Sequence, residues 1–169
     1  MLPILEIYLA GGLFNVAERY RNILLALSLQ AADQGRKIII PQIEAEKFHN
    51  ADGTFDLPAI RKDCVDHCSD RGTICVACLD GPDADSGTVC EFTVAMENTG
   101  RAISYRTDFR TDEKSEIGVN GMLRAEGSVF IYLPCLESGM QPLDNFILKL
   151  ARTILEEIVK IEKAEGRGR

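Results

Sequence analysis

The apolar positions of this chain alternate between short continuous runs and longer stretches with helical spacing. The short runs are rich in Ile, Val and Leu and predict strands over residues 4–9, 37–40, 73–79, 102–105 and 129–133. The longer stretches carry apolar residues three or four positions apart and predict helices over residues 16–34, 57–68, 88–98 and 143–163. Strands that alternate with helices indicate an α/β fold. Five such strands favour a flavodoxin-like, doubly wound, five-stranded parallel sheet flanked by helices.

The first and last predicted helices each carry an apolar stripe, which we expect to face the sheet. The stripe of the first helix consists of Ile23, Leu24, Leu27 and Ala31. The stripe of the last helix consists of Phe146, Ile147, Leu150, Ile154, Ile158 and Val159. Residues 42–57 show no clear period and predict a loop. The chain therefore predicts one domain over residues 1–165, followed by a frayed tail at 166–169.

Composition narrows the class of protein. The 169 residues are 46% hydrophobic, which is enough for the core of one domain. Nineteen basic against 26 acidic side chains give a net charge of −7, which disfavours binding to a nucleic-acid backbone. No apolar run reaches the roughly 18–20 residues of a membrane span, and the start lacks the basic segment of a secretory signal. We therefore expect a cytoplasmic protein whose six cysteines remain reduced thiols.

Ligands of doubly wound sheets bind beyond the carboxyl ends of the strands, which here selects the segment 80–91. This segment holds three aspartates and ends at Glu91, in the first turn of a predicted helix. Asp85 and Glu91 could face one pocket, and paired carboxylates are what glycosyl chemistry uses. The alternative is structural, because Thr88 and Glu91 also have the spacing of a helix capping box.

Four segments of the chain resemble the nucleoside 2-deoxyribosyltransferase family. They are the opening strand and loop at 7–14, the D-x-G-x-x-x-E signature within 80–95, the strand and loop at 100–110, and the N-x-M element at 120–122. Together they extend over about two thirds of the chain. The central signature is the most specific of the four.

The resemblance implies a retaining double displacement that moves a 2-deoxyribosyl group between nucleobases. Glu91 would be the nucleophile that attacks C1′ of a 2′-deoxyribonucleoside, and Tyr8 would hydrogen-bond and orient it. Asp85 would hold sugar hydroxyls. The substrates would be nucleosides and free nucleobases, no cofactor or metal would be needed, and the activity would serve nucleotide salvage.

The resemblance also implies residues that bind substrate. Gly11 and Phe14 of the first loop and Gly87 of the central signature would contact the nucleoside. Asn120 and Met122 would reach into the site of a neighbouring subunit, which implies a homo-oligomer with shared sites.

Two parts of the family pattern are not matched clearly. An aspartate that helps to protonate the departing base has two candidates, Asp63 and Asp66, of which we favour Asp63. Base recognition within residues 42–56 could fall to Glu44, Glu46 or His49. The preference for purine or pyrimidine, the acceptance of ribonucleosides and the number of subunits stay open.

Three other readings compete with the transferase. A metal or redox site is suggested by a cluster of ligating side chains: Cys64, His67, Cys68, Cys75 and Cys78. However, Cys75 and Cys78 lie in one predicted strand, where positions three apart face opposite sides. An N-glycosidase on the same scaffold would use water as the acceptor, often with nucleoside 5′-monophosphates, but the first loop is apolar and favours an unphosphorylated nucleoside. The third reading is a non-catalytic flavodoxin-like binding module.

Overall fold

A computed structural model of the chain describes residues 4–110, 118–124 and 127–167. Its strands are β1 (Glu6–Ala10), β2 (Lys37–Ile39), β3 (Thr73–Cys78), β4 (Ala102–Arg106) and β5 (Val129–Tyr132). They form one parallel sheet in the order β2-β1-β3-β4-β5. The register places Tyr8 of β1 between Ile39 of β2 and Cys75 of β3. The predicted five-stranded, doubly wound sheet is confirmed.

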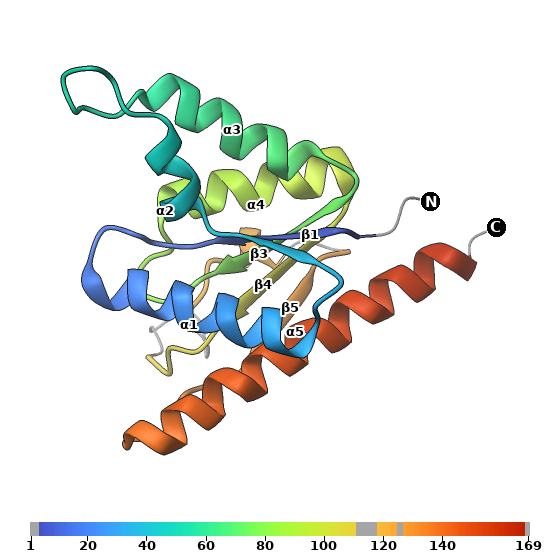
Figure 1. The fold of residues 1–169 in the computed structure, drawn as a ribbon. Helices are drawn as coiled ribbons and strands as arrows, with labels where there is room; N and C mark the ends of the chain where they lie inside the picture. Colours follow the sequence, from blue (N-terminus) through green and yellow to red (C-terminus); the bar gives the residue numbers. More distant parts are fainter. Residues whose placement is uncertain (1–3, 111–117, 125–126, 168–169) are drawn as a thin grey trace.

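Helices cover both faces of this sheet (Figure 1). The helical segments are α1 (Val16–Ala32), α2 (Pro41–Glu44), η1 (Ala45–Lys47), α3 (Leu57–Ser69), α4 (Ser86–Thr99), η2 (Gly121–Leu123) and α5 (Met140–Arg167). Helices α1 and α5 pack on one face, where Leu25 and Ile154 join a core with Ile7 and Val76. Helices α3 and α4 pack on the other face, around Tyr8 and Cys75. Each strand therefore supplies side chains to two separate cores, which explains its apolar character on both faces.

The sheet-facing side of α1 differs from the predicted stripe. The buried residues of this helix are Asn22, Leu25, Ala26 and Leu29. Leu27 is 63% exposed and Ala31 is also exposed, so the stripe assigned to them was wrong. The stripe of α5 was largely right, since Phe146, Leu150, Ile154 and Ile158 are buried, although Val159 is 37% exposed.

The segment predicted as a loop contains structure that positions the candidate site. Pro41 begins α2, as expected of a proline that tolerates the first helical turn, and η1 follows directly. His49 and Phe55 then form an isolated bridge before α3 begins. A four-residue helix is too short to show a periodic pattern, which is why the sequence did not indicate it.

The bounds of α4 and α5 differ from the predicted ones. Helix α4 begins at Ser86, two residues before the predicted start, because Asp85 is its N-cap. It ends at Gly100, whose φ of 68° is the left-handed conformation that glycine adopts at little cost. Helix α5 continues to Arg167, into the segment expected to be frayed, and residues 168–169 lie outside the described residues. None of the helices in the described ranges is both long and apolar enough to cross a membrane.

Candidate active site

A cavity of about 490 Å³ opens beyond the carboxyl ends of β1 and β3. Its walls come from the loop after β1, from α1, from α2 and η1, from α3, and from the first turns of α4. This is the place at which parallel doubly wound sheets bind their ligands, because the chain changes direction there and the loops diverge. The residues that line it include five that the sequence analysis named as candidate site residues: Gly11, Phe14, Asp85, Gly87 and Glu91.

Glu91 lines the cavity and contacts the buried Tyr8, although 83 positions separate them. The Tyr8 hydroxyl donates a 2.7 Å hydrogen bond to Oε1 of Glu91. Tyr8 is 1% exposed, and burial raises the pKa of its phenol, so it remains the donor. Burial also raises the pKa of Glu91, while the bonds from Tyr8 and Cys64 oppose that rise. The predicted contact between these two residues is present.

Cys64 is a residue of this site that the sequence reasoning missed. Leu57, Ile60 and Cys64 lie on one face of α3 and line the cavity. The Cys64 side chain interacts with both Tyr8 and Glu91, and its interaction with Glu91 lowers the pKa of that carboxyl. Burial raises the pKa of its thiol to about 12, so the thiol stays protonated and acts as a donor to the carboxylate. The spacing of Leu57, Ile60 and Cys64 was the signal available in the sequence.

Asp85 combines a structural and a ligand-facing position. Its Oδ1 accepts hydrogen bonds from the Thr88 amide at 2.8 Å and from the Thr88 hydroxyl at 3.0 Å, which caps α4. The structural alternative of a Thr88–Glu91 capping box is therefore not what forms: Asp85 caps the helix, and Glu91 bonds with Tyr8. The negative charge of Asp85 also adds to the rise in the pKa of Glu91.

Asp80, the first aspartate of the segment 80–91, has a structural role. Asp80 accepts hydrogen bonds from the amide and hydroxyl of Thr107, both at 2.6 Å, and from the Asp108 amide at 2.9 Å. Oδ2 of Asp80 also lies 3.8 Å from Nη1 of Arg21. Asp80 thus joins the loop after β3 to the loop after β4 and does not line the cavity.

A buried amide network braces the opposite wall. Nδ2 of Asn22 donates to the Gly12 carbonyl at 3.1 Å and to Oε1 of Gln42 at 3.2 Å. Nε2 of Gln42 in turn donates to the Arg19 carbonyl at 3.2 Å. These bonds hold the loop after β1 against α2. Gln42 and Arg19 line the cavity, and the sequence reasoning singled out neither for it.

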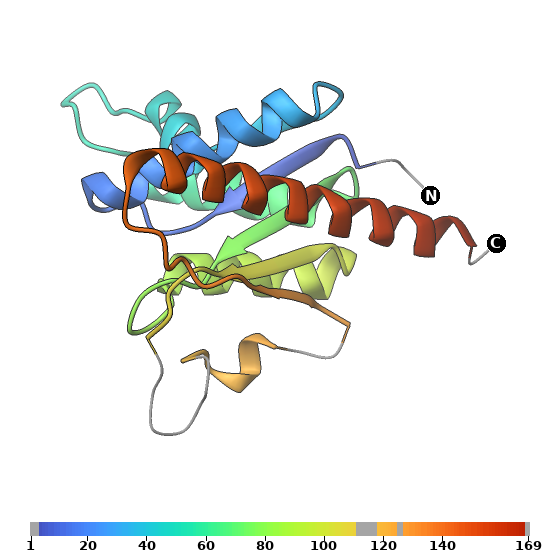
Figure 2. The same cartoon turned by 90° about the horizontal axis from the view of Figure 1, so that it is seen from below.

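The other predicted site residues lie elsewhere. Asn120 accepts a hydrogen bond from the Met122 amide and caps η2, and Met122 is 83% exposed. Figure 2 shows η2 beside the β5 edge of the sheet, far from α2. A role of both residues in a neighbouring subunit stays a prediction. Asp63 does not line the cavity either, while its neighbour Cys64 does.

The two cysteines of the C-x-x-C sequence face opposite sides of β3, as predicted. Cys75 belongs to the core under α3 and α4, and Cys78 belongs to the core under α1 and α5. Both are buried. They cannot converge on one metal ion or form one disulfide in this arrangement.

Comparisons with known proteins give the fold of the chain. No protein-family model and no curated protein matches the sequence. Among solved structures, a conserved protein from Enterococcus faecalis V583 is similar with a TM-score of 0.62 and 21% identity, over 86% of this chain and 98% of its own. The 2-deoxyribosyltransferase of the psychrotolerant bacterium Bacillus psychrosaccharolyticus is similar with a TM-score of 0.55 and 18% identity, over 83% of this chain and 90% of its own. The chain thus shares its flavodoxin-like fold with a 2-deoxyribosyltransferase.

Proposed function

We propose that this protein is a nucleoside 2-deoxyribosyltransferase that works through a covalent deoxyribosyl–Glu91 intermediate. The observation that carries the proposal is the hydrogen bond from the buried Tyr8 to Glu91, which lines one cavity together with Asp85. The resemblance of the sequence signature and the fold shared with a 2-deoxyribosyltransferase support the same conclusion. The substrates are 2′-deoxyribonucleosides and free nucleobases, and the proposal includes a homo-oligomer and a cytoplasmic role in nucleotide salvage.

The first step forms a glycosyl ester. One carboxylate oxygen of Glu91 attacks C1′ of the sugar, and the bond between C1′ and the base nitrogen breaks. The electron pair of that bond leaves with the base, which takes a proton from solvent. The absence of a 2′-hydroxyl makes an oxocarbenium-like centre easier to form, so a carboxylate nucleophile can suffice.

The second step transfers the sugar. A nitrogen of the acceptor base attacks C1′, the ester bond to Glu91 breaks, and the acceptor loses its proton to solvent. The carboxylate is regenerated. Each step inverts the configuration at C1′, so the product retains the configuration of the donor.

The surroundings of Glu91 suit a nucleophile that must be ionised yet poorly hydrated. Burial removes water from the carboxylate, while the Tyr8 hydroxyl and the Cys64 thiol hold it in one orientation. Asp85 lines the same cavity, where it would hold the sugar hydroxyls. Asp63 lies outside the cavity lining, so the arrangement offers no support for its proposed role as an acid.

A second candidate function follows from Arg19. This arginine lines the cavity and is exposed, so its guanidinium is available at the cavity mouth. Arginine pairs well with phosphate, which favours an N-glycosidase that hydrolyses a nucleoside 5′-monophosphate. Water would then attack C1′ in place of the acceptor base.

A base-exchange assay separates the two candidates. The protein is incubated with 2′-deoxyinosine or thymidine, with and without adenine, and with 2′-deoxyinosine 5′-monophosphate, and products are separated by chromatography. We expect 2′-deoxyadenosine to form only when adenine is present, and Glu91→Gln to abolish it. Glu97→Gln, an exposed glutamate on the same helix, is the matched control. Free base from the monophosphate without any new nucleoside would establish the hydrolase instead.

A further inference from the structure

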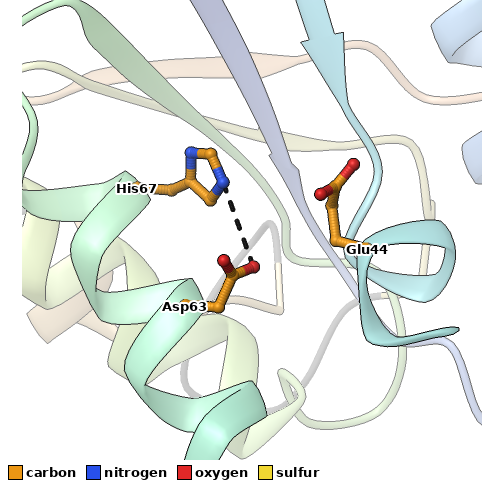
Figure 3. A group of neighbouring side chains, drawn as sticks. All are labelled: Glu44, Asp63 and His67. Atoms are coloured by element: carbon orange, nitrogen blue, oxygen red, sulfur yellow. Dashed lines mark ion pairs between the residues drawn. The ribbon is translucent and has the colours of Figure 1, made fainter. Parts of the chain in front are cut away.

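A second cluster of ligating side chains lies where α2 meets α3, next to the cavity but not part of its lining (Figure 3). Glu44 comes from α2, and Asp63 and His67 come from one face of α3, four positions apart. One ligand atom from each lies within 4.8 Å of the other two. All three side chains are partly buried, with exposed fractions of 16% for Glu44, 30% for Asp63 and 19% for His67.

A carboxylate on the Nδ1 side of the His67 ring orients this side chain. Its Nδ1 lies 3.3 Å from Oε2 of Glu6, which comes from β1, and its Nε2 points toward Asp63 with Oδ2 at 3.9 Å. The ring also stacks on Tyr8, with 5.8 Å between ring centroids. A histidine that donates from Nδ1 to a carboxylate presents its Nε2 lone pair on the other side, and this is how metal-ligating histidines are commonly held.

The ligand set selects a class of cation. One imidazole nitrogen and two carboxylate oxygens suit Zn²⁺ or a similar divalent transition metal, whereas Mg²⁺ prefers oxygen ligands alone. Ligand atoms about 2.0–2.2 Å from a tetrahedral Zn²⁺ lie roughly 3.3 Å apart, so the three groups must approach one another by up to about 1.5 Å. The side chains of Glu44 and Asp63 have the rotatable bonds for that approach.

Charge around the cluster also favours a cation. Glu6, Glu44 and Asp63 place three carboxylates around His67. Lys47 pairs with Glu44, but its side chain is 63% exposed, and exposed ion pairs contribute little. A divalent ion can displace that ammonium group at small cost.

We propose that Glu44, Asp63 and His67 bind one Zn²⁺ ion, with Glu6 as a positioning residue for His67. The ion would link α2 to α3. Both elements line the cavity, through Gln42 and Ala45 from α2 and η1 and through Cys64 from α3, so the ion would fix the distance between two of its walls. The proposed transfer steps use no metal, so the ion would act only through the spacing of these walls.

Metal binding to the full chain tests the proposal. Protein freed of metal by chelation is dialysed against Zn²⁺, and bound metal is measured by elemental analysis. We expect one equivalent per chain, affinity reduced about tenfold or more in His67→Gln and Asp63→Asn, and a smaller loss in Glu6→Gln. Asp66→Asn is the matched control, because Asp66 lies on the same helix but pairs with Lys62. Lys47→Met should bind Zn²⁺ more tightly than the wild type, because the competing ammonium group is gone.

Two outcomes would overturn the proposal. One is Zn²⁺ binding that is absent from the wild type or equal in the wild type and His67→Gln. The other is a thiolate-to-metal charge-transfer band when Co²⁺ is used as the probe, which would assign the ion to cysteine. If the α3 variants fail to fold, as judged by circular dichroism without metal, Glu44→Gln and Lys47→Met on the short α2–η1 segment decide the question by opposite changes in affinity. Failure of the wild type to bind Zn²⁺ would leave the proposed base exchange standing, because neither transfer step uses a metal.

Discussion

Replacing Tyr8 by Phe removes a single oxygen that donates to the proposed nucleophile. The aromatic ring stays, so the packing of β1 against Cys75 and Phe92 is preserved. The lost bond measures 2.7 Å and ends on a carboxylate. Hydrogen bonds to charged groups contribute about 1.5–3 kcal/mol, and one pKa unit corresponds to about 1.4 kcal/mol.

The consequence is a change in the pH dependence of transfer. The bond from Tyr8 stabilises the ionised form of Glu91 and therefore holds the pKa of this carboxyl down against the effect of burial. Without it the pKa rises, and a larger fraction of the nucleophile is protonated at low pH. We expect the acid limb of kcat/KM in Tyr8→Phe to move to higher pH by about 1 to 2 units.

The assay is base exchange from 2′-deoxyinosine to adenine, measured across the pH range in which the wild type remains folded. Tyr132→Phe is the control, because Tyr132 lies on β5, separated from β1 by β3 and β4. An acid limb that coincides in Tyr8→Phe and the wild type would refute the argument that Tyr8 tunes Glu91. A circular dichroism melt of each variant shows whether the fold survives.

Three further predictions concern stability and binding. Burial raises the pKa of Glu91 in the folded state, so ionisation of Glu91 costs folding free energy. This cost is absent below the unfolded pKa and is complete once pH lies above the folded pKa. Glu91→Gln should therefore exceed the wild type in Tm by more at about pH 8 than at about pH 4, and an equal difference at both would contradict this. Asp85→Ala should lose about 1 kcal/mol of stability, because the cap of α4 is lost. Asp85→Asn should keep the cap and still raise KM. Equal KM values in Asp85→Asn and the wild type would show that the charge of Asp85 plays no part in sugar binding. Leu29→Ala should cost about 2–5 kcal/mol in urea denaturation and Leu27→Ala less than about 0.5 kcal/mol, and the reverse order would restore the stripe predicted from the sequence.

The sheet and its helices could be predicted because their signals are local. A strand buried on both faces is apolar throughout, and a helix repeats every three to four residues, so both patterns are visible without knowing any partner. The prediction of the buried face of α1 was wrong because the local pattern there is ambiguous. Residues 23–29 are apolar almost all round, and only packing against the sheet and α5 selects Leu25 and Leu29 over Leu27.

Some features of the candidate site could likewise be predicted from the sequence, and others could not. The sequence by itself determined the alternation of strands and helices, the acidic segment after β3, and, through a family resemblance, the pairing of Tyr8 with Glu91. Only the tertiary structure decided that Cys64 and not Asp63 lines the cavity, and that His67 of α3 faces Glu44 of α2. These contacts join residues 23 to 56 positions apart, from Glu44 and His67 to Tyr8 and Cys64. Their existence depends on the strand order that sets β1 beside β3, and no local pattern of side chains records that order.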